Sequence, residues 1–367
     1  MASSASSGAP VYRAAHGGLG NGRGGVGGVS PRPANIRDVA REAGVSTSTV
    51  SRILDERLPP SQSATAERVR SVAQQLGYRR DAYASALRRQ HTGTVGVLVP
   101  RLSDTVMAIL FEEVARVCGQ RSEFAIVATT NDDPQAERTA AEILLRQRVD
   151  GLILTTARLD DDFTAQLRTD GVPHVLALRT DGVSPSSTGD DELGGYLATR
   201  HLLDLGHRSI GVVAGPSYAS NAVGRVRGFH RAMDEAGLVV DHRLVRESTF
   251  GMESGEEVAR SLLGGPQQPT AVFAVNDNTA IGVLAAAQSL GLTVPHDLSV
   301  VGYNDIPLSA RLPVPLTTVR VPFAQIASAA VELLQRRPED TGSNNHVVAT
   351  PTLIPRRTST RPATTDR

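Results

Sequence analysis

The chain has 367 residues, which is long for one domain, and its 40% apolar content is enough for a substantial hydrophobic core. The formal net charge is zero, but residues 34–90 hold ten Arg against six acidic residues, whereas residues 91–367 hold 25 Arg against 32 acidic residues. A basic N-terminal region followed by an acidic remainder is typical of a small nucleic-acid-binding unit joined to a ligand-binding one. The single Cys118 excludes an internal disulfide. No apolar run approaches the roughly 18 residues of a membrane span, so we expect a cytoplasmic protein without a membrane partner.

The N-terminal residues 1–33 are rich in Ala, Ser and Gly and show no periodicity, which predicts a disordered tail. Residues 36–54 read IRDVAREAGVSTSTVSRIL, which predicts two short helices joined by a turn at Gly44. Glycine suits that position because a positive φ costs it nothing. Asn35 and Ser46 are the expected N-caps of the two helices.

The second helix, expected over residues 47–54, turns Val50, Ile53 and Leu54 inward. Its outward side carries short hydroxyls and one guanidinium, on Thr47, Ser48, Ser51 and Arg52. Such a surface is typical of a helix that lies in the major groove of DNA. The alternative is an ordinary solvated helix.

A third helix is expected from about Thr65 to Leu76 and completes a three-helix head over residues 34–78. One face of it is apolar, with Val69, Val72, Ala73 and Leu76. Residues 79–91 (RRDAYASALRRQH) are expected to form a hinge or linker, because the segment is too polar and too short to fold alone.

From Thr94 onward the pattern changes to short apolar runs separated by helical segments. The runs are VGVLV, FAIVAT, GLILTT, HVLAL, IGVVAG, AVFAV and LSVVGY. This alternation predicts an α/β body of doubly wound parallel sheets with helices on both faces. About ten alternations exceed one such sheet, so we expect two lobes with a ligand cleft beyond the carboxyl ends of their strands.

Several longer motifs resemble the LacI/GalR (lactose-repressor-like) family of bacterial transcription regulators. They include residues 36–54, RVDGLIL at 148–154, HLLDLGHRSIGVVAGP at 201–216 and VPHDLSVVGYNDIP at 294–307. The resemblance covers about residues 34–357. It implies a helix-turn-helix head, a hinge helix, and a periplasmic-binding-protein-like effector-binding and dimerisation body over residues 92–357. Residues 358–367, which follow it, are expected to form a disordered tail. It also implies that the chain crosses between the lobes near Asp190, Val321 and Thr350.

For the DNA contacts, the resemblance implies that Thr47, Ser48 and Arg52 read bases. Ser46, Thr49 and Ser51 are expected to contact phosphate or to cap the helix. In the hinge, Ala84 and Leu87 are implied to enter the minor groove, where Leu87 wedges between base steps. The alternative for Leu87 is a simple packing role.

For the effector site, the resemblance implies that Arg225, in RVRGF, clamps the ligand; a structural salt bridge is the alternative. Polar contacts are implied for Ser103, Asp104, Asn276 and Asn304, with Phe323 as an apolar wall. Asn304 and Leu178 stand where many members of the family carry Asp, and no aromatic pair follows the first strand. These departures argue against a standard hexose effector.

Signatures of an enzyme are absent from the sequence. The first strand is not followed by GxGxxG, and the histidines show no metal-ligand spacing. We therefore expect no enzyme activity, no cofactor and no metal. The predicted function is that of a homodimeric transcription regulator, most simply a repressor, which binds a near-palindromic double-stranded operator under the control of a sugar or similar effector. The alternative is a two-lobed sugar-binding transport receptor without a role in DNA binding.

Overall fold

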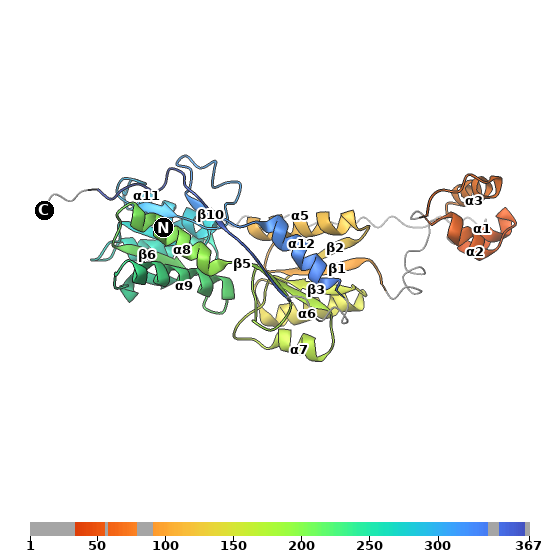
Figure 1. The fold of residues 1–367 in the computed structure, drawn as a ribbon, viewed down its shortest axis with the longest axis horizontal. Coiled ribbons are helices and arrows are strands. Elements are labelled where there is room, and N and C mark those ends of the chain that lie inside the picture. Colours follow the sequence, from red (N-terminus) through yellow and green to blue (C-terminus); the bar gives the residue numbers. More distant parts are fainter. Residues whose placement is uncertain (1–33, 56–57, 79–90, 337–344, 364–367) are drawn as a thin grey trace, which may run out of the picture. The chain divides into compact units, whose positions relative to one another are not determined.

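The computed structural model describes residues 34–55, 58–78, 91–336 and 345–363 (Figure 1). Contacts between Cα atoms divide the chain into two compact units, with the boundary between residues 82 and 83. The expected tail over residues 1–33 and most of the hinge over residues 79–91 lie outside the described residues. No helix in the described part of the chain combines the length and apolar character needed to cross a membrane.

The first unit, which we call the head, contains α1 (Ile36–Ala43), α2 (Thr47–Ile53) and α3 (Ala64–Gln75). The predicted caps are confirmed. The side chain of Asn35 accepts hydrogen bonds from the first-turn N–H groups of Arg37 and Asp38, and Ser46 accepts one from the N–H of Thr49. Gly44 ends α1 with a φ of 67°. The two helices are therefore fixed by local hydrogen bonds at both sides of the turn.

The head encloses a small core of side chains from all three helices, which are Val39, Ala40, Ala43, Val50, Val69, Val72 and Ala73. The expectation for Leu76 is wrong, since this side chain is 39% exposed. The reason is that α3 ends at Gln75, with Leu76 as its C-cap, and the chain then turns at Gly77 with a φ of 60°.

The second unit, which we call the body, begins with a six-stranded sheet of order β11-β5-β4-β3-β1-β2, in which every neighbouring pair is parallel. Its strands are β1 (Thr94–Val99), β2 (Phe124–Thr129), β3 (Gly151–Leu154), β4 (His174–Ala177), β5 (Ser186–Gly189) and β11 (His346–Ala349). This sheet is the centre of the first lobe.

The second lobe has a four-stranded parallel sheet of order β7-β6-β8-β9. Its strands are β6 (Ile210–Ala214), β7 (Val245–Glu247), β8 (Ala271–Ala274) and β9 (Ser299–Val301). A separate antiparallel ribbon pairs β10 (Thr318–Arg320) with β12 (Thr352–Ile354). The doubly wound, two-lobed body predicted from the apolar runs is thus confirmed.

Helices cover both faces of each sheet (Figure 1). In the first lobe α5 (Thr105–Gln120) packs with α12 (Phe323–Leu334) on one face, and α6 (Pro134–Arg146) and α7 (Phe163–Thr169) cover the other. In the second lobe the two packed pairs are α8 (Asp191–Asp204) with α9 (Ser220–Glu235) and α10 (Met252–Leu263) with α11 (Asp277–Ser289). A short 3₁₀ turn, η1 (His242–Leu244), precedes β7.

The chain passes between the lobes at three places, between β5 and α8, between β10 and α12, and between β11 and β12. These agree with the crossings expected near Asp190, Val321 and Thr350.

The expectation of a disordered tail from residue 358 is wrong for residues 358–363, because Thr358 is fully buried. Its Oγ1 accepts a hydrogen bond from the N–H of Thr317 at 2.8 Å, and its carbonyl accepts one from the N–H of Val300 at 2.7 Å. The last four residues lie outside the described part.

Candidate functional site

The head presents the outward face of α2 to solvent. Thr47, Ser48 and Arg52 are exposed, whereas Thr49 and Ser51 are half-buried. The guanidinium of Arg52 makes no ion pair or hydrogen bond with another described residue, so its planar fork of donors is available to a guanine edge or a phosphate. This is the arrangement that the sequence predicts for base reading.

Ser46 has a different environment on the same helix. Its hydroxyl accepts from the N–H of Thr49 at 3.1 Å and lies 2.8 Å from the hydroxyls of Ser48 and Thr49. Ser46 and Thr49 therefore fix the first turn of α2, and the hydroxyl of Ser48 is hydrogen-bonded to that of Ser46. Ala84 and Leu87 lie outside the described residues, so their minor-groove role stays a prediction.

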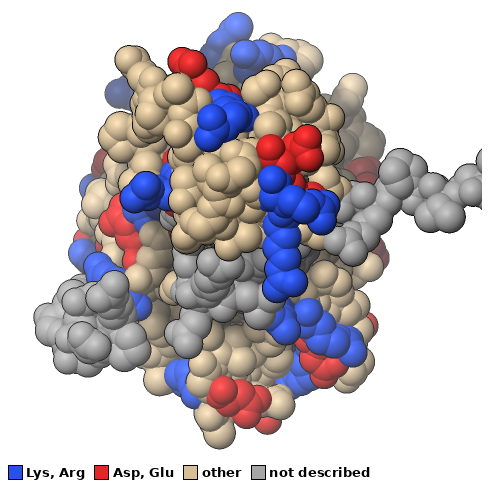
Figure 2. Space-filling model, turned by 90° about the vertical axis from the view of Figure 1, so that its right-hand side faces the viewer, with Lys and Arg blue, Asp and Glu red and all other residues tan. Residues whose placement is uncertain are grey.

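Charge is mixed on the face that Figure 2 presents, where Arg side chains alternate with acidic ones and with uncharged areas. Such a surface attracts phosphate only locally, through individual arginines.

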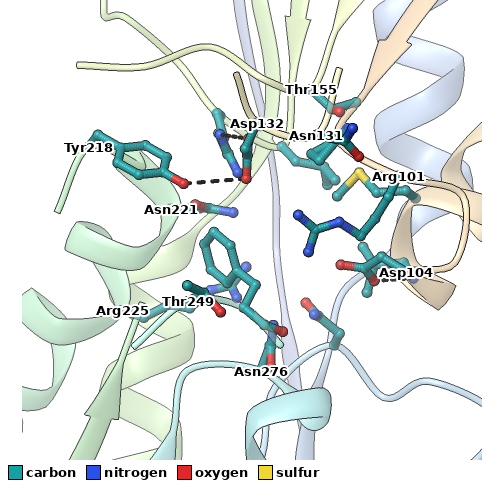
Figure 3. Close-up of a pocket in the computed structure, with 17 residues that line it drawn as sticks. Arg101, Asp104, Asn131, Asp132, Thr155, Tyr218, Asn221, Arg225, Thr249 and Asn276 are labelled. Carbon is teal, nitrogen blue, oxygen red and sulfur yellow. Dashed lines mark hydrogen bonds and ion pairs between the residues drawn. The ribbon is translucent and has the colours of Figure 1, made fainter. Parts of the chain in front are cut away.

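The body contains a cavity of about 360 Å³ between its two lobes (Figure 3). Its lining comes from the loops that follow the carboxyl ends of strands in both sheets. Those loops follow β1, β2, β3 and β4 in the first lobe and β6, β7, β8 and β9 in the second. A cavity at this edge of parallel sheets is the usual place for a small ligand.

The cavity brings together four of the six side chains predicted for the effector site, which are Asp104, Arg225, Asn276 and Asn304. Ser103 and Phe323 are not among its lining residues. Ser103 is exposed in the turn before α5, and Phe323 begins α12 and packs into the hydrophobic core. Their predicted ligand contacts have no support in this geometry.

Arg225 lies on α9 and is only 5% exposed. Its Nε donates to Oδ1 of Asp191 at 2.8 Å, its Nη1 donates to the carbonyl of Val275 at 2.8 Å, and the group stacks 3.8 Å from the ring centre of Tyr303. The structural salt bridge that the sequence left open is thus present, and Arg225 also lines the cavity. Burial raises the pKa of Asp191 to about 6, although Arg225 beside it acts in the opposite direction.

The two asparagines predicted for the effector site differ in their hydrogen bonds. Asn276 is the N-cap of α11: its side chain accepts from the N–H of Thr279 at 2.7 Å and donates to the carbonyl of Phe250 at 3.0 Å. The side-chain amide of Asn304 makes no hydrogen bond with another described residue, and the backbone of Asn304 has a φ of 108°. Leu178, also in the lining, has a φ of 65°. Backbone strain of this kind is common where a structure holds side chains toward a ligand.

Asp104 caps α5 by accepting from the N–H of Val106 at 3.0 Å, and it also receives a long 3.5 Å contact from Nδ2 of Asn278 in the second lobe. Burial raises the pKa of its carboxyl. The described residues contain no cluster of three or more His, Cys, Asp or Glu side chains that could hold a metal ion.

Several lining residues were missed by the sequence analysis, among them Arg101, Asp132, Arg179, Tyr218 and Asn221. Arg179 pairs with Asp132 at 3.2 Å, and the hydroxyl of Tyr218 donates to the same carboxylate at 3.3 Å. The available signal was position, because each of these residues except Asn221 follows a predicted strand within a few residues, whereas Asn221 lies in α9.

Comparisons with known proteins agree with this architecture. Residues 35–81 match the family described as bacterial regulatory proteins, lacI family, and residues 199–359 match a periplasmic binding protein-like domain. The transcriptional repressor PurR of Photobacterium profundum is 32% identical over 86% of this chain and 95% of its own length.

Two solved structures extend the likeness to the fold. The lac repressor dimer bound to operator and an anti-inducer has a TM-score of 0.80 at 28% identity, over 90% of this chain and all of that one. The regulator CelR in complex with cellobiose has a TM-score of 0.68 at 28% identity, over 89% of this chain and all of that one.

The relatives are named as transcription regulators, and the head of this chain is the part that a transport receptor would lack. The alternative of a two-lobed transport receptor is therefore not supported. The chain belongs to the lacI family of bacterial regulatory proteins and is a DNA-binding transcription regulator.

Proposed function

We propose that this regulator is a cytoplasmic repressor whose affinity for a near-palindromic operator is controlled by a sugar or related metabolite bound in the cavity. One observation carries the proposal. A single chain combines unpaired donors on α2 with a cavity of about 360 Å³ lined by polar side chains from both lobes. The relative named PurR is a repressor, and the CelR structure contains cellobiose, which supports both halves of the proposal.

Control by a ligand follows from the origin of the lining. Asp104 belongs to the first lobe, whereas Arg225 and Asn304 belong to the second. A ligand that contacts both lobes favours one relative position of them, and this differential affinity is what shifts an equilibrium. Coupling between ligand and operator is reciprocal and typically amounts to about 1–3 kcal/mol. The ligand either releases the operator or strengthens binding, and the sign is an outcome of the experiment.

The experiment is a gel-shift assay with DNA selected by the full chain from a randomised pool, carried out with the parent, Arg52→Ala and Arg146→Ala. Arg146 is an exposed arginine on α6 and serves as the matched control. We expect the parent and the control to select and bind one near-palindromic sequence, and Arg52→Ala to bind it more weakly. A parent that selects no sequence would show that the proposed function is wrong.

We propose that the operator-binding form is a homodimer, and β2 supplies the supporting observation. This strand lies at the edge of the six-stranded sheet, yet Phe124 is 75% and Ile126 44% exposed. Apolar side chains on an uncovered edge strand are normally covered by another element or chain. A second copy of the chain is the occupant that a two-fold symmetric operator requires.

Light scattering tests the homodimer. We expect a dimer for the parent, a shift toward monomer for Phe124→Asp, and no shift for Val239→Asp, which changes an apolar side chain that is 96% exposed in a loop. A stable tetramer of the parent, or an unchanged dimer of Phe124→Asp, contradicts this assignment.

A further inference from the structure

Two arginines of the cavity are ion-paired, whereas Asp104 and Arg101 are not. Arg179 pairs with Asp132 at 3.2 Å, and Arg225 pairs with Asp191 at 2.8 Å. Asp104 caps α5, and its charge attracts that of Arg101 from beyond ion-pair distance. Arg101, in contrast, makes no ion pair or hydrogen bond with any described residue. Its guanidinium points into the cavity, as Figure 3 shows.

Across the cavity from Arg101 lies Asn221, at the start of α9. Asn221 is only 9% exposed, and its Oδ1 accepts from the N–H of Ala222 at 2.9 Å. Its Nδ2 donates to no described residue and points into the cavity (Figure 3). The N-cap of α9 is Ala219, whose methyl group accepts no hydrogen bond, so Asn221 serves the N–H of Ala222 in its place. The positive end of this helix therefore adds to the donors on that side.

The rest of the lining suits a ligand with hydroxyl groups. The amides of Asn131 and Asn304 are in the lining and make no side-chain hydrogen bond with another described residue. Tyr218 and Phe250 are also in the lining, and the guanidinium of Arg158 stacks 3.5 Å from the ring centre of Tyr218. A cavity of about 360 Å³ lies at the small end of the range for small-molecule sites, which corresponds to a molecule about the size of a monosaccharide.

We propose that the ligand is a monosaccharide-sized polyol that carries one anionic group, a carboxylate or a phosphate, held between Arg101 and Asn221. This inference rests on the proposed function and names the class of ligand that acts at the same cavity. The physical reason is that no carboxylate contacts the Arg101 guanidinium, since Asp104 attracts it only from beyond ion-pair distance. A neutral ligand covers Arg101 and removes its water without supplying a counter-charge, which is unfavourable. A carboxylate or phosphate instead accepts two parallel hydrogen bonds from the guanidinium fork.

The test is calorimetry on the full chain at constant ionic strength, with ligands that share one skeleton. Glucose, gluconate and glucose 6-phosphate differ in carrying no anion, a carboxylate or a phosphate, and acetate and inorganic phosphate serve as minimal anions. At least one of the anionic ligands is expected to bind about tenfold more tightly than glucose, because a hydrogen bond to a charged group is about twice as strong as a neutral one. Gluconate and glucose 6-phosphate together tell which anion is preferred.

Three variants locate the binding. Arg101→Gln removes the charge of an exposed side chain and is expected to abolish the advantage of the anion over glucose. Asn221→Asp keeps the acceptor of the Ala222 N–H and replaces the inward donor with a negative group, so it is expected to weaken anion binding as well. Arg146→Gln, on the surface of α6, is the matched control and is expected to bind like the parent.

The proposal is overturned if none of the four anions binds more tightly than glucose, or if Arg101→Gln retains the advantage. A gel shift with the selected operator separates this failure from failure of the proposed function. If operator affinity changes only with neutral sugars, the proposed function stands and the proposal of an anionic ligand is wrong. If anions bind in a way that depends on Arg101 but never change operator affinity, the proposal of an anionic ligand stands and the proposed control of DNA binding is wrong.

Discussion

The head and the cavity of the body use arginine in opposite ways. Arg52 on α2 is exposed and its side chain makes no ion pair or hydrogen bond with another described residue, so its donors are available to DNA. Arg225 is buried, paired with Asp191 and hydrogen-bonded to the carbonyl of Val275, so it holds the body together as well as lining the cavity. A substitution of Arg52 is therefore expected to alter DNA binding alone. A substitution of Arg225 is expected to alter both ligand binding and the stability of the body.

The largest effect is expected for Arg225→Met, which keeps most of the side-chain length but leaves Asp191 buried without its partner. The free energy of unfolding of the body is expected to fall by about 3–5 kcal/mol, as it does when one member of a buried pair is removed. Chemical denaturation followed by circular dichroism measures it. Operator binding in the absence of ligand is expected to persist, since the head is a separate unit.

This loss of stability is expected to depend on pH, because the pKa of Asp191 is about 6. At pH values above that pKa the carboxyl is charged, and Arg225 supplies its counter-charge. Below it the carboxyl is protonated in the parent too, so removing Arg225 leaves no buried charge. The destabilisation by Arg225→Met is therefore expected to be larger at about pH 8 than at about pH 5. An equal loss at both pH values contradicts the ionic role.

An intermediate effect is expected for Arg52→Ala in the head. Binding to the preferred operator is expected to weaken by about 1–3 kcal/mol and the choice at one base pair to relax, with no change in the free energy of unfolding. Fluorescence anisotropy on the selected operator and on single-base variants measures both. Equal weakening on all sequences indicates that Arg52 contacts phosphate only.

The smallest effects are expected from the helix caps, which the two regions share. Ser46→Ala and Asn276→Ala each remove a side-chain acceptor from a first-turn N–H, at a cost of about 1 kcal/mol. Thermal unfolding measures the loss, and operator and ligand titrations sharpen the comparison. Ser46→Ala is expected to weaken operator binding only, and Asn276→Ala ligand binding only. An effect of Ser46→Ala on ligand binding of the operator-free protein contradicts the separation of the two sites.

The head could be predicted in detail because its determinants are contiguous. The caps at Asn35 and Ser46, the turn at Gly44 and the face of α2 all follow from local hydrogen bonding within residues 35–54. The strands with apolar runs could also be predicted from the sequence. β5 was not, because its sequence is SSTG although all four residues are buried.

The cavity could be predicted only in part. Family resemblance placed Asp104, Arg225, Asn276 and Asn304 near it. Arg101, in a loop, and Asn221, at the start of α9, carry no local signal that distinguishes them from their neighbours. Their importance depends on which distant charges are already paired, which only the folded body shows. The burial of Thr358 was missed for the same reason, since its partners Thr317 and Val300 are far from it in sequence.

The most direct test of the account is the dissociation constant of the full chain for its selected operator, measured with and without the metabolite that most raises the melting temperature of the body. We predict a change of at least about fivefold, the lower end of typical coupling between two sites, and its loss in Arg225→Met. A dissociation constant that stays the same, in a sample shown by calorimetry to be saturated with that metabolite, would contradict the claim that the cavity controls the head.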